Sequence, residues 1–261
     1  MEVGGGKSSG KAYSGSLGAL CGQPERNRMN VMTMSRARGV VALALLLCGV
    51  GVARTEAPET AYPSMAPLEQ YRSKSREDEI ALARSAAPPS IADAAEILTL
   101  GAHGYDVAVE GKNGFVCVVE RSWANDFDSA DFWNPKVRAP NCFNAAAARS
   151  VLPTYLKRTE WALGGVSRAE MVDRTKAALA AKQVKEPEVG AMCYMMSKGG
   201  YLGDDVRGHW HPHLMFFLPR TSASAWGANE EGSPLFASTG ALEPVTIFLL
   251  PVSHWSDGTP E

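Results

Sequence analysis

The sequence predicts an α+β fold, in which a single domain combines a mainly antiparallel sheet with two to four packed helices. Short apolar runs flanked by Gly, Pro or Ser, which are typical of strands, occur on both sides of a central helical region. The chain is 45% hydrophobic, which is enough to form a packed core. No linker-like stretch interrupts residues 90–256, so we expect this range to form one α+β domain.

The N-terminal region has the pattern of an export signal. Residues 34–53 begin with two nearby arginines, continue as an uncharged apolar run and end on small residues, so cleavage is expected after Ala53. The run is shorter than the ~20 residues of a spanning helix, and an uncleaved anchor is the alternative. Residues 1–33 are expected to be a mis-called or disordered extension, or else a cytoplasmic tail. We therefore predict a periplasmic or secreted protein with no integral membrane span after signal cleavage.

The charge balance argues against a nucleic-acid partner. The formal net charge is −2, from 26 Lys and Arg against 28 Asp and Glu, whereas nucleic-acid-binding domains normally carry a basic surplus. Residues 54–89 are expected to form a polar lead-in and a solvated helix over 67–85, because charges of both signs alternate there. A solvated helix of this kind is not expected to bind a ligand.

The first predicted elements of the domain are a short helix and a hairpin. Ser90 can cap a helix that runs through Leu98. Residues 105–110 alternate between apolar and polar side chains, residues 111–114 are Gly-Lys-Asn-Gly, and residues 115–120 are again apolar. Because Asn and Gly tolerate positive φ angles, the sequence predicts a β-hairpin here.

Two helices and three strands complete the predicted domain. Residues 145–163 are expected to be helical, with Pro153 starting or kinking the second part. Ser167 and Glu170 form a capping box, which predicts a second helix over 168–184. The three remaining strands are expected at residues 191–197, 214–218 and 245–252.

The cysteines that follow the predicted signal suggest one disulfide. Cys117 lies in a predicted strand, Cys142 follows Pro140, and Cys193 lies in an apolar run. Because exported proteins meet oxidising conditions, we predict a Cys117–Cys142 disulfide with Cys193 buried and free. Three buried free thiols are the alternative.

A cluster of histidines is the main candidate for a metal site. In an extended segment, His209, His211 and His213 would point to one face, which suits the three nitrogen ligands of a zinc or copper site. His254 is a further candidate ligand. The alternative is that His209 and His211 are solvated at a sheet edge while His213 hydrogen-bonds a backbone carbonyl at the core margin.

Three tryptophans are candidate binding residues. Trp210, Trp226 and Trp255 each lie near a His or a Gly-rich loop, so together with His213 and the 198–208 loop they could line a ligand cleft. Tryptophans also commonly anchor cores, and that alternative stays open.

Several short segments resemble a group of exported bacterial proteins with no assigned activity. The resemblance covers about residues 90–255 and implies export and a single domain. The segments that carry it are Asn113-Gly114-Phe115-Val116-Cys117-Val118-Val119-Glu120-Arg121, Cys142-Phe143, Met195-Met196-Ser197 and Pro212-His213-Leu214-Met215-Phe216-Phe217.

Three functional hypotheses remain at this point. The first is an exported domain that binds a small molecule or an envelope partner. The second is a metal-dependent enzyme, a zinc hydrolase or copper oxidoreductase using His209, His211 and His213, with a general base such as Asp204, Asp205 or Glu243. The third is a structural envelope component. No nucleotide-binding loop or nucleophile elbow is present in the sequence.

Overall fold

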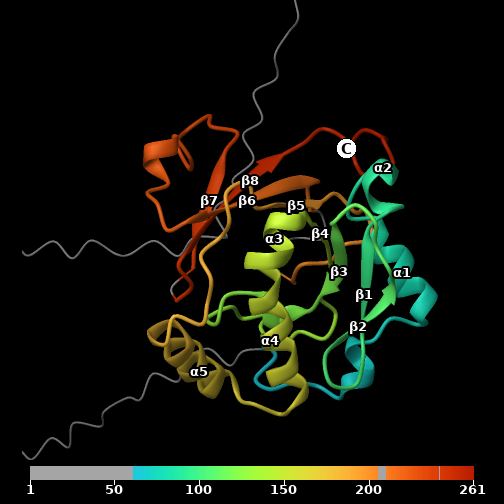
Figure 1. Ribbon diagram of the computed structural model, residues 1–261, viewed down its shortest axis with the longest axis vertical. Coiled ribbons are helices and arrows are strands. Elements are labelled where there is room, and N and C mark those ends of the chain that lie inside the picture. The colour runs from blue at the N-terminus through green and yellow to red at the C-terminus, as the bar shows by residue number, and fades with distance from the viewer. Residues whose placement is uncertain (1–60, 205–209, 241) are drawn as a thin grey trace, which may run out of the picture. The chain divides into compact units, whose positions relative to one another are not determined.

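In the computed structural model, an eight-stranded sheet runs through the described residues, which are 61–204, 210–240 and 242–261 (Figure 1). The strand order is β2-β1-β3-β4-β5-β6-β8-β7. All neighbouring strands are antiparallel except β1 and β3, which are parallel. The strands are β1 (Glu96–Leu100), β2 (Tyr105–Val109), β3 (Val116–Glu120), β4 (Ala139–Phe143), β5 (Met192–Met195), β6 (His213–Pro219), β7 (Phe236–Thr239) and β8 (Val245–Pro251).

Helices cover both faces of this sheet. Side-chain alternation along β3 directs Val118 to one face, where it packs with residues of α3 and α4, and Cys117 to the other, where it packs with residues of α1. The α-helices are α1 (Arg76–Arg84), α2 (Pro89–Ala92), α3 (Ala145–Ser150), α4 (Leu152–Leu163) and α5 (Arg168–Ala180). Short 3-10 helices are η1 (Leu68–Tyr71), η2 (Ser122–Ala124) and η3 (Ser224–Trp226). The predicted α+β class with a mainly antiparallel sheet is confirmed.

The central helices begin where their local signals predict them, but α5 ends at Ala180 and not at the predicted residue 184. Pro153 lies in the first turn of α4, directly after α3 ends. The Ser167 hydroxyl accepts a hydrogen bond from the Glu170 backbone N–H at 3.2 Å, so Ser167 caps α5. The predicted strands at 191–197, 214–218 and 245–252 correspond to β5, β6 and β8.

The predicted hairpin between residues 105–110 and 115–120 is wrong. Both strands exist, as β2 and β3, but β1 lies between them. The backbone N–H of Glu96 donates to the Phe115 carbonyl, and the N–H of Lys112 donates to the Ala94 carbonyl, both at 2.8 Å. The Gly-Lys-Asn-Gly segment therefore crosses the start of β1 instead of forming the turn of a hairpin.

The expected helix from Ser90 to Leu98 is wrong beyond Ala92, and Ser90 does not cap it, because α2 begins at Pro89 and has no side-chain cap. Residues 96–100 form β1, which has strands on both sides and buried side chains on both faces. A run of buried residues without a polar face is typical of such a strand. Residues 96–100 form a strand because they pair with β2 and β3. A capping residue carries no information about such pairing.

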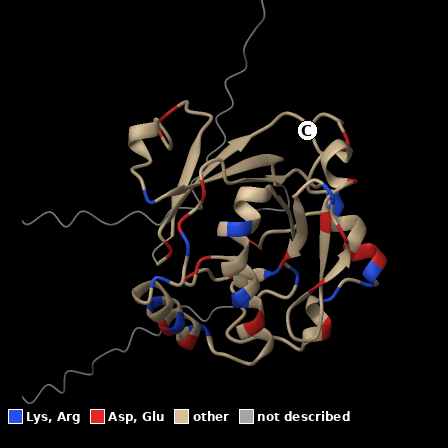
Figure 2. Ribbon diagram, in the orientation of Figure 1, with Lys and Arg blue, Asp and Glu red and all other residues tan. Residues whose placement is uncertain are grey.

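The solvated helix expected over 67–85 is solvated on one face only. Glu79 and Ala83 of α1 are buried, and Tyr71 of η1 is fully buried. Charged residues of α1 line its outer side, as Figure 2 shows by colour. Helix α1 is thus a structural layer over β1, β3 and β4.

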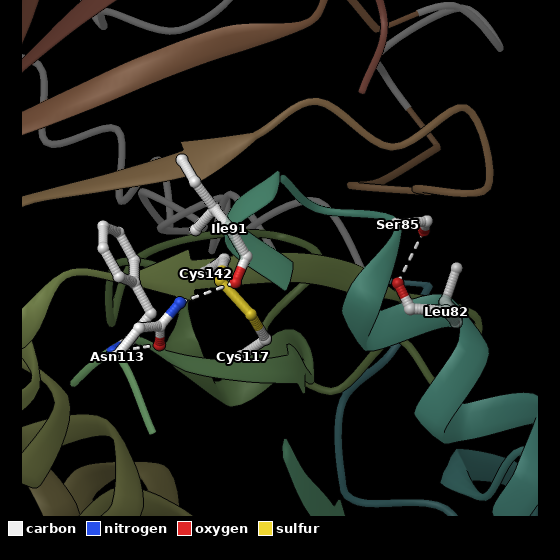
Figure 3. Close-up of a disulfide and its surroundings, with 7 residues drawn as sticks. Leu82, Ser85, Ile91, Asn113, Cys117 and Cys142 are labelled. Atoms are coloured by element: carbon white, nitrogen blue, oxygen red, sulfur yellow. Dashed lines mark hydrogen bonds between the residues drawn. A yellow bond between two sulfur atoms is a disulfide. The ribbon is translucent and has the colours of Figure 1, made fainter. Parts of the chain in front are cut away.

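The predicted Cys117–Cys142 disulfide is confirmed. The two residues face each other directly across β3 and β4 and form the disulfide beneath α2 (Figure 3). Cys193 on β5 is buried and free, also as predicted.

Disulfides are typical of oxidising compartments. None of the helices in the described ranges is long and apolar enough to cross a membrane. The predicted extension 1–33 and signal 34–53 lie outside those ranges.

Strand β7, at one edge of the sheet, has its outer side capped by a side chain. The Asn229 amide donates to the Ala237 carbonyl and accepts from the Ala237 N–H, both at 2.9 Å. Asn229 itself has a positive φ of 63°, which Asn tolerates better than most residues. One amide thus occupies both polar groups of Ala237 that another strand could pair with.

We predict that Asn229→Gly promotes self-association and lowers the free energy of unfolding by about 1–2 kcal/mol. Glycine keeps the positive φ but removes two hydrogen bonds, each worth about 0.5–1.5 kcal/mol, and leaves the β7 edge open. Analytical ultracentrifugation and urea unfolding measure both effects. Lys182→Gly is the matched control, because Lys182 also has a positive φ, 55°. A monomeric Asn229→Gly variant as stable as Lys182→Gly would contradict this role.

Candidate functional site

The two described histidines of the predicted cluster lie in different environments. The His211 ring is exposed, and its Nδ1 contacts the Glu261 carboxylate. His213 is buried at the start of β6, where its Nδ1 donates to the His211 carbonyl at 2.8 Å. For His213, the alternative of a hydrogen bond to a backbone carbonyl at the core margin is therefore observed. Burial lowers the pKa of His213, which favours its neutral form.

A three-histidine metal site stays a prediction. His209 and Asp205 lie outside the described residues. Within residues 61–204, 210–240 and 242–261, no group of three or more His, Cys, Asp or Glu side chains is arranged to hold a metal ion. His254 lies near the C-terminus, with its Nδ1 2.9 Å from the Ser253 hydroxyl.

The three candidate tryptophans do not line one cleft. Trp210 and Trp255 are 7% and 8% exposed and belong to the same core cluster. The Trp210 ring packs edge-on against His213, with 5.0 Å between ring centroids. Trp226 is 55% exposed and packs on Phe248, on the other face of the sheet. Trp210 and Trp255 are thus core residues, and Trp226 belongs to a separate surface.

A hollow lies beside the Trp255 region, at the end of α1. It has a volume of about 230 Å³ and is bordered by α1, α2 and the C-terminal segment. Its polar lining residues are Arg84, Ser85, Asp93, Ser256 and Asp257. We call it the α1 hollow. It is smaller than the ~300–1,000 Å³ of typical drug-sized sites, so it fits a small ligand.

Backbone and hydroxyl contacts hold the walls of the α1 hollow together. The Ser85 hydroxyl donates to the Leu82 carbonyl (Figure 3) and lies 2.6 Å from the Ser197 hydroxyl. The Met196 N–H donates to the Ala86 carbonyl, and the Ser256 N–H donates to the Met196 carbonyl, both at 2.9 Å. The residues directly before the predicted 198–208 cleft loop therefore contact both the Trp255 region and the residues that follow α1.

Arg84 is the residue in the α1 hollow whose hydrogen bonding is incomplete. Its Nε is buried without an acceptor, and its guanidinium makes no hydrogen bond or ion pair within the described part of the chain. Across the hollow, Asp257 is engaged by Lys198 at 2.8 Å and by Thr259, and these contacts hold the pKa of Asp257 below its usual range. Arg84 thus offers donors for an acidic group.

Four polar residues of the α1 hollow, Arg84, Ser85, Asp93 and Ser256, were not predicted from the sequence. Arg84 belongs to the segment in which alternating charges predict a solvated helix face. The run Ser85-Ala86-Ala87, directly before two prolines, was the available signal, since consecutive small residues allow close packing. Asp93 and Ser256 have no local signal, because α2 and the C-terminal segment meet only in the folded domain.

A second group of polar side chains is buried under α4. Glu120 on β3 accepts a hydrogen bond from the Asn141 amide at 3.1 Å, while its Oε1 is buried with no partner in the described residues. Burial raises the pKa of Glu120 to about 7. Tyr155 and Cys193 face the same region, and burial raises the pKa of both.

The cation that acts on Glu120 is Arg158, and its guanidinium already has other partners. Arg158 of α4 donates to the Trp123, Ala124 and Asn125 carbonyls, pairs with Glu243 and packs over the Phe127 ring. It therefore compensates Glu120 only in part. Glu243, a candidate general base, is paired with Arg158 near this cluster.

No known protein family, characterised protein or solved structure matches the chain significantly.

We predict that the domain loses stability as the pH rises from about 4.5 to above 7, because of Glu120. The group is protonated in the folded state up to a pKa of about 7 but ionises near 4.5 when unfolded. The unfolded state then binds fewer protons, so rising pH favours unfolding, by up to about 3 kcal/mol.

Glu120→Gln should remove this part of the pH dependence. The free energy of unfolding of the variant should therefore fall less between pH 5 and pH 8 than that of the wild type. Urea unfolding at both pH values measures the change. Glu110→Gln, at an exposed position, is the control and should follow the wild-type profile. The assignment fails if Glu120→Gln and the wild type lose the same stability between the two pH values.

Proposed function

We propose that this chain is an exported domain that binds a small acidic ligand in the α1 hollow. The observation that carries the proposal is that Arg84 lines a hollow of about 230 Å³ while its buried Nε lacks an acceptor among the described residues. A buried donor without a partner costs about 1–3 kcal/mol, and a ligand carboxylate would remove this cost.

The chemistry of the hollow favours a carboxylate over a larger apolar molecule. A guanidinium presents a planar set of donors that matches a carboxylate, and hydrogen bonds between charged groups are the stronger ones. Asp93 lies at the rim, where it is exposed and forms no ion pair with Arg84, so it is placed to attract a positive group of the same ligand. A small amino acid or dicarboxylate satisfies the size limit.

Support for export comes from two features. The disulfide between Cys117 and Cys142 is typical of oxidising compartments. Residues 34–53 have the charge and hydrophobicity pattern of a signal peptide. We therefore place the ligand in the periplasm or outside the cell.

Glycine and succinate are suitable probes of the proposed site. We expect at least one of them to raise the melting temperature of the wild type, and Arg84→Gln to weaken its binding by tenfold or more, because a charge-assisted hydrogen bond is worth about 1.5–3 kcal/mol. Isothermal titration calorimetry measures the affinity. Arg76→Gln, on the exposed side of the same helix, is the matched control.

Equal binding by Arg84→Gln and Arg76→Gln would refute the site. If neither probe nor a wider set of carboxylates binds the wild type, a structural envelope component becomes the better hypothesis.

One observation favours the metal-dependent enzyme as a second candidate. Because a carbonyl can only accept, Nδ1 of His213 carries the proton in its bond to His211, and Nε2 is left with a lone pair. Metal-binding histidines commonly donate their other N–H to a carbonyl in this way. His213 is therefore suited to bind zinc or copper through Nε2.

Metal analysis tests this second candidate directly. We expect the purified, untagged chain to retain about one equivalent of zinc or copper, and His213→Gln to retain less than a tenth of that amount, since the loss of one of three ligands removes most affinity. Elemental mass spectrometry measures the content. His103→Gln, an exposed histidine, is the control. A wild type without bound metal after zinc and copper loading would exclude this candidate.

A further inference from the structure

A second and larger hollow lies beside the turn between α4 and α5. Its volume is about 500 Å³, within the ~300–1,000 Å³ typical of small-molecule sites. Its principal lining residues are Met65, Trp133, Ala162, Val166 and Arg168. It shares no lining residue with the α1 hollow.

The floor of this hollow is aromatic and fixed. Trp133 is buried and packs edge-on against Phe132, with 4.8 Å between ring centroids. The Trp133 carbonyl accepts a hydrogen bond from the Tyr71 hydroxyl at 2.7 Å. Ala162 and Val166 add apolar surface from α4 and the following turn. The floor therefore suits the apolar body of a ligand.

Arg168 is the ionisable side chain of the hollow. Its guanidinium lies 5.8 Å from the centroid of the Phe132 ring, and its Nη1 donates to the Ser129 carbonyl at 3.2 Å. Nε and Nη2 make no hydrogen bond within the described residues. No acidic residue is among those that line the hollow, so the charge on Arg168 is open to an anion.

One wall of the hollow is a short segment that we call the strap, residues 63–65. The residues on either side of it are held: the Tyr62 hydroxyl donates to Asp204 at 2.5 Å, and the Ala66 N–H donates to the Tyr71 hydroxyl at 3.2 Å. The strap residues make no hydrogen bond to the described part of the chain. The strap can therefore move without breaking hydrogen bonds of its own.

We propose that this hollow binds an amphipathic anion, with the apolar body on Trp133 and the acidic group on Arg168, under the strap. The neutral floor supplies hydrophobic contact, and the single cation selects for a carboxylate or sulfonate. This site is independent of the proposed α1 hollow, because the two differ in size, lining and cation.

Two matched dyes test the proposal: anilinonaphthalene sulfonate, which is anionic, and N-phenylnaphthylamine, which lacks the sulfonate. We expect the native wild type to bind one equivalent of the anionic dye. Arg168→Gln should weaken that binding about tenfold and leave the affinity for the neutral dye unchanged, since only the charge-assisted contact is lost. Dye fluorescence titration measures both affinities, and near-ultraviolet circular dichroism checks that each variant is folded.

Further variants distinguish binding in this hollow from binding elsewhere on the surface. Arg174→Gln, on α5 but outside the hollow, is the matched control and should bind like the wild type. Arg168→Lys keeps the charge and should retain most of the affinity. Tyr62→Phe loses one strap anchor, so both the association and dissociation rates of the dye should rise.

Two outcomes would overturn the proposal. One is equal binding of the anionic dye by Arg168→Gln and Arg174→Gln, and the other is dye fluorescence only where the near-ultraviolet signal is lost. Arg84→Gln should bind the dye normally, so a failure at the α1 hollow and a failure here are distinguishable.

Discussion

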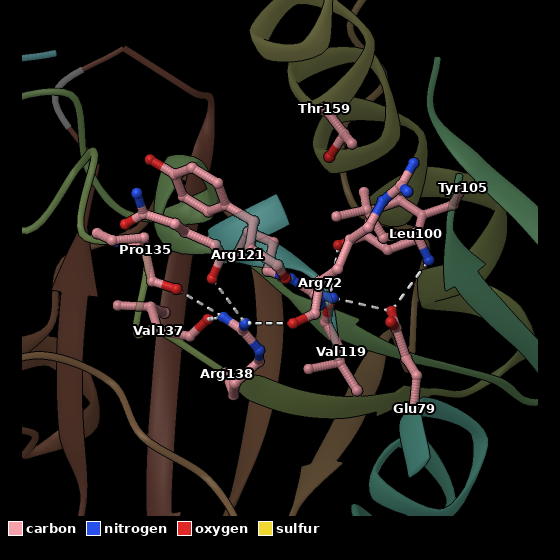
Figure 4. Close-up of polar contacts among 12 residues, drawn as sticks. Arg72, Glu79, Leu100, Tyr105, Val119, Arg121, Pro135, Val137, Arg138 and Thr159 are labelled. Atoms are coloured by element: carbon pink, nitrogen blue, oxygen red, sulfur yellow. Dashed lines mark hydrogen bonds and ion pairs between the residues drawn. The ribbon is translucent and has the colours of Figure 1, made fainter. Parts of the chain in front are cut away.

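The buried ion pair between Arg121 and Glu79 determines how the layers of this domain meet. Both side chains are excluded from water, and Arg121 Nη2 lies 3.0 Å from Glu79 Oε1 (Figure 4). The same carboxylate oxygen accepts the Leu100 N–H at 3.0 Å, and Arg121 Nε donates to the Tyr71 carbonyl at 2.7 Å. The Arg121 guanidinium, directly after β3, thus contacts α1 and η1, and its partner Glu79 connects the pair to β1. Because removal of one partner of a buried pair costs about 3–5 kcal/mol, this arrangement has little freedom to change.

Both hollows depend on that arrangement. Arg84 lies at the end of α1, so the helix position set by Glu79 also sets the position of the unpartnered guanidinium. On the other side, the Tyr71 hydroxyl accepts a hydrogen bond from the Ala66 N–H, directly after the strap, and donates one to the Trp133 carbonyl. Arg138 adds support by donating to the Gln70 and Arg72 carbonyls, and burial lowers its pKa to about 10. Polar groups inside the domain therefore fix the apolar and charged walls of the surface sites.

Local sequence signals predicted local structure well and pairing poorly. The Ser167 cap, the Pro153 break between helices and the facing cysteines all depend on neighbouring residues or on a short strand pair. The position of β1 between β2 and β3 depends on contacts between segments that the turn chemistry of 111–114 does not report. The same limitation explains the candidate site, because Arg84 and Ser256 are far apart in sequence and meet only through the packing of α1.

The α+β class follows from the sequence, because the period of the apolar residues differs between strands and helices. The Cys117–Cys142 disulfide with a buried free Cys193 was predicted from residue type and the export signal, with three free thiols as the alternative. The carbonyl bond of His213 was the alternative to a metal site. Three further features depend on how the layers pack. Trp210 and Trp255 are core residues, burial raises the pKa of Glu120 to about 7, and Arg84 and Arg168 each line a hollow. These features depend on desolvation and on distances between remote segments. Both quantities are set when the layers pack, and neither can be derived from the order of residues along the chain.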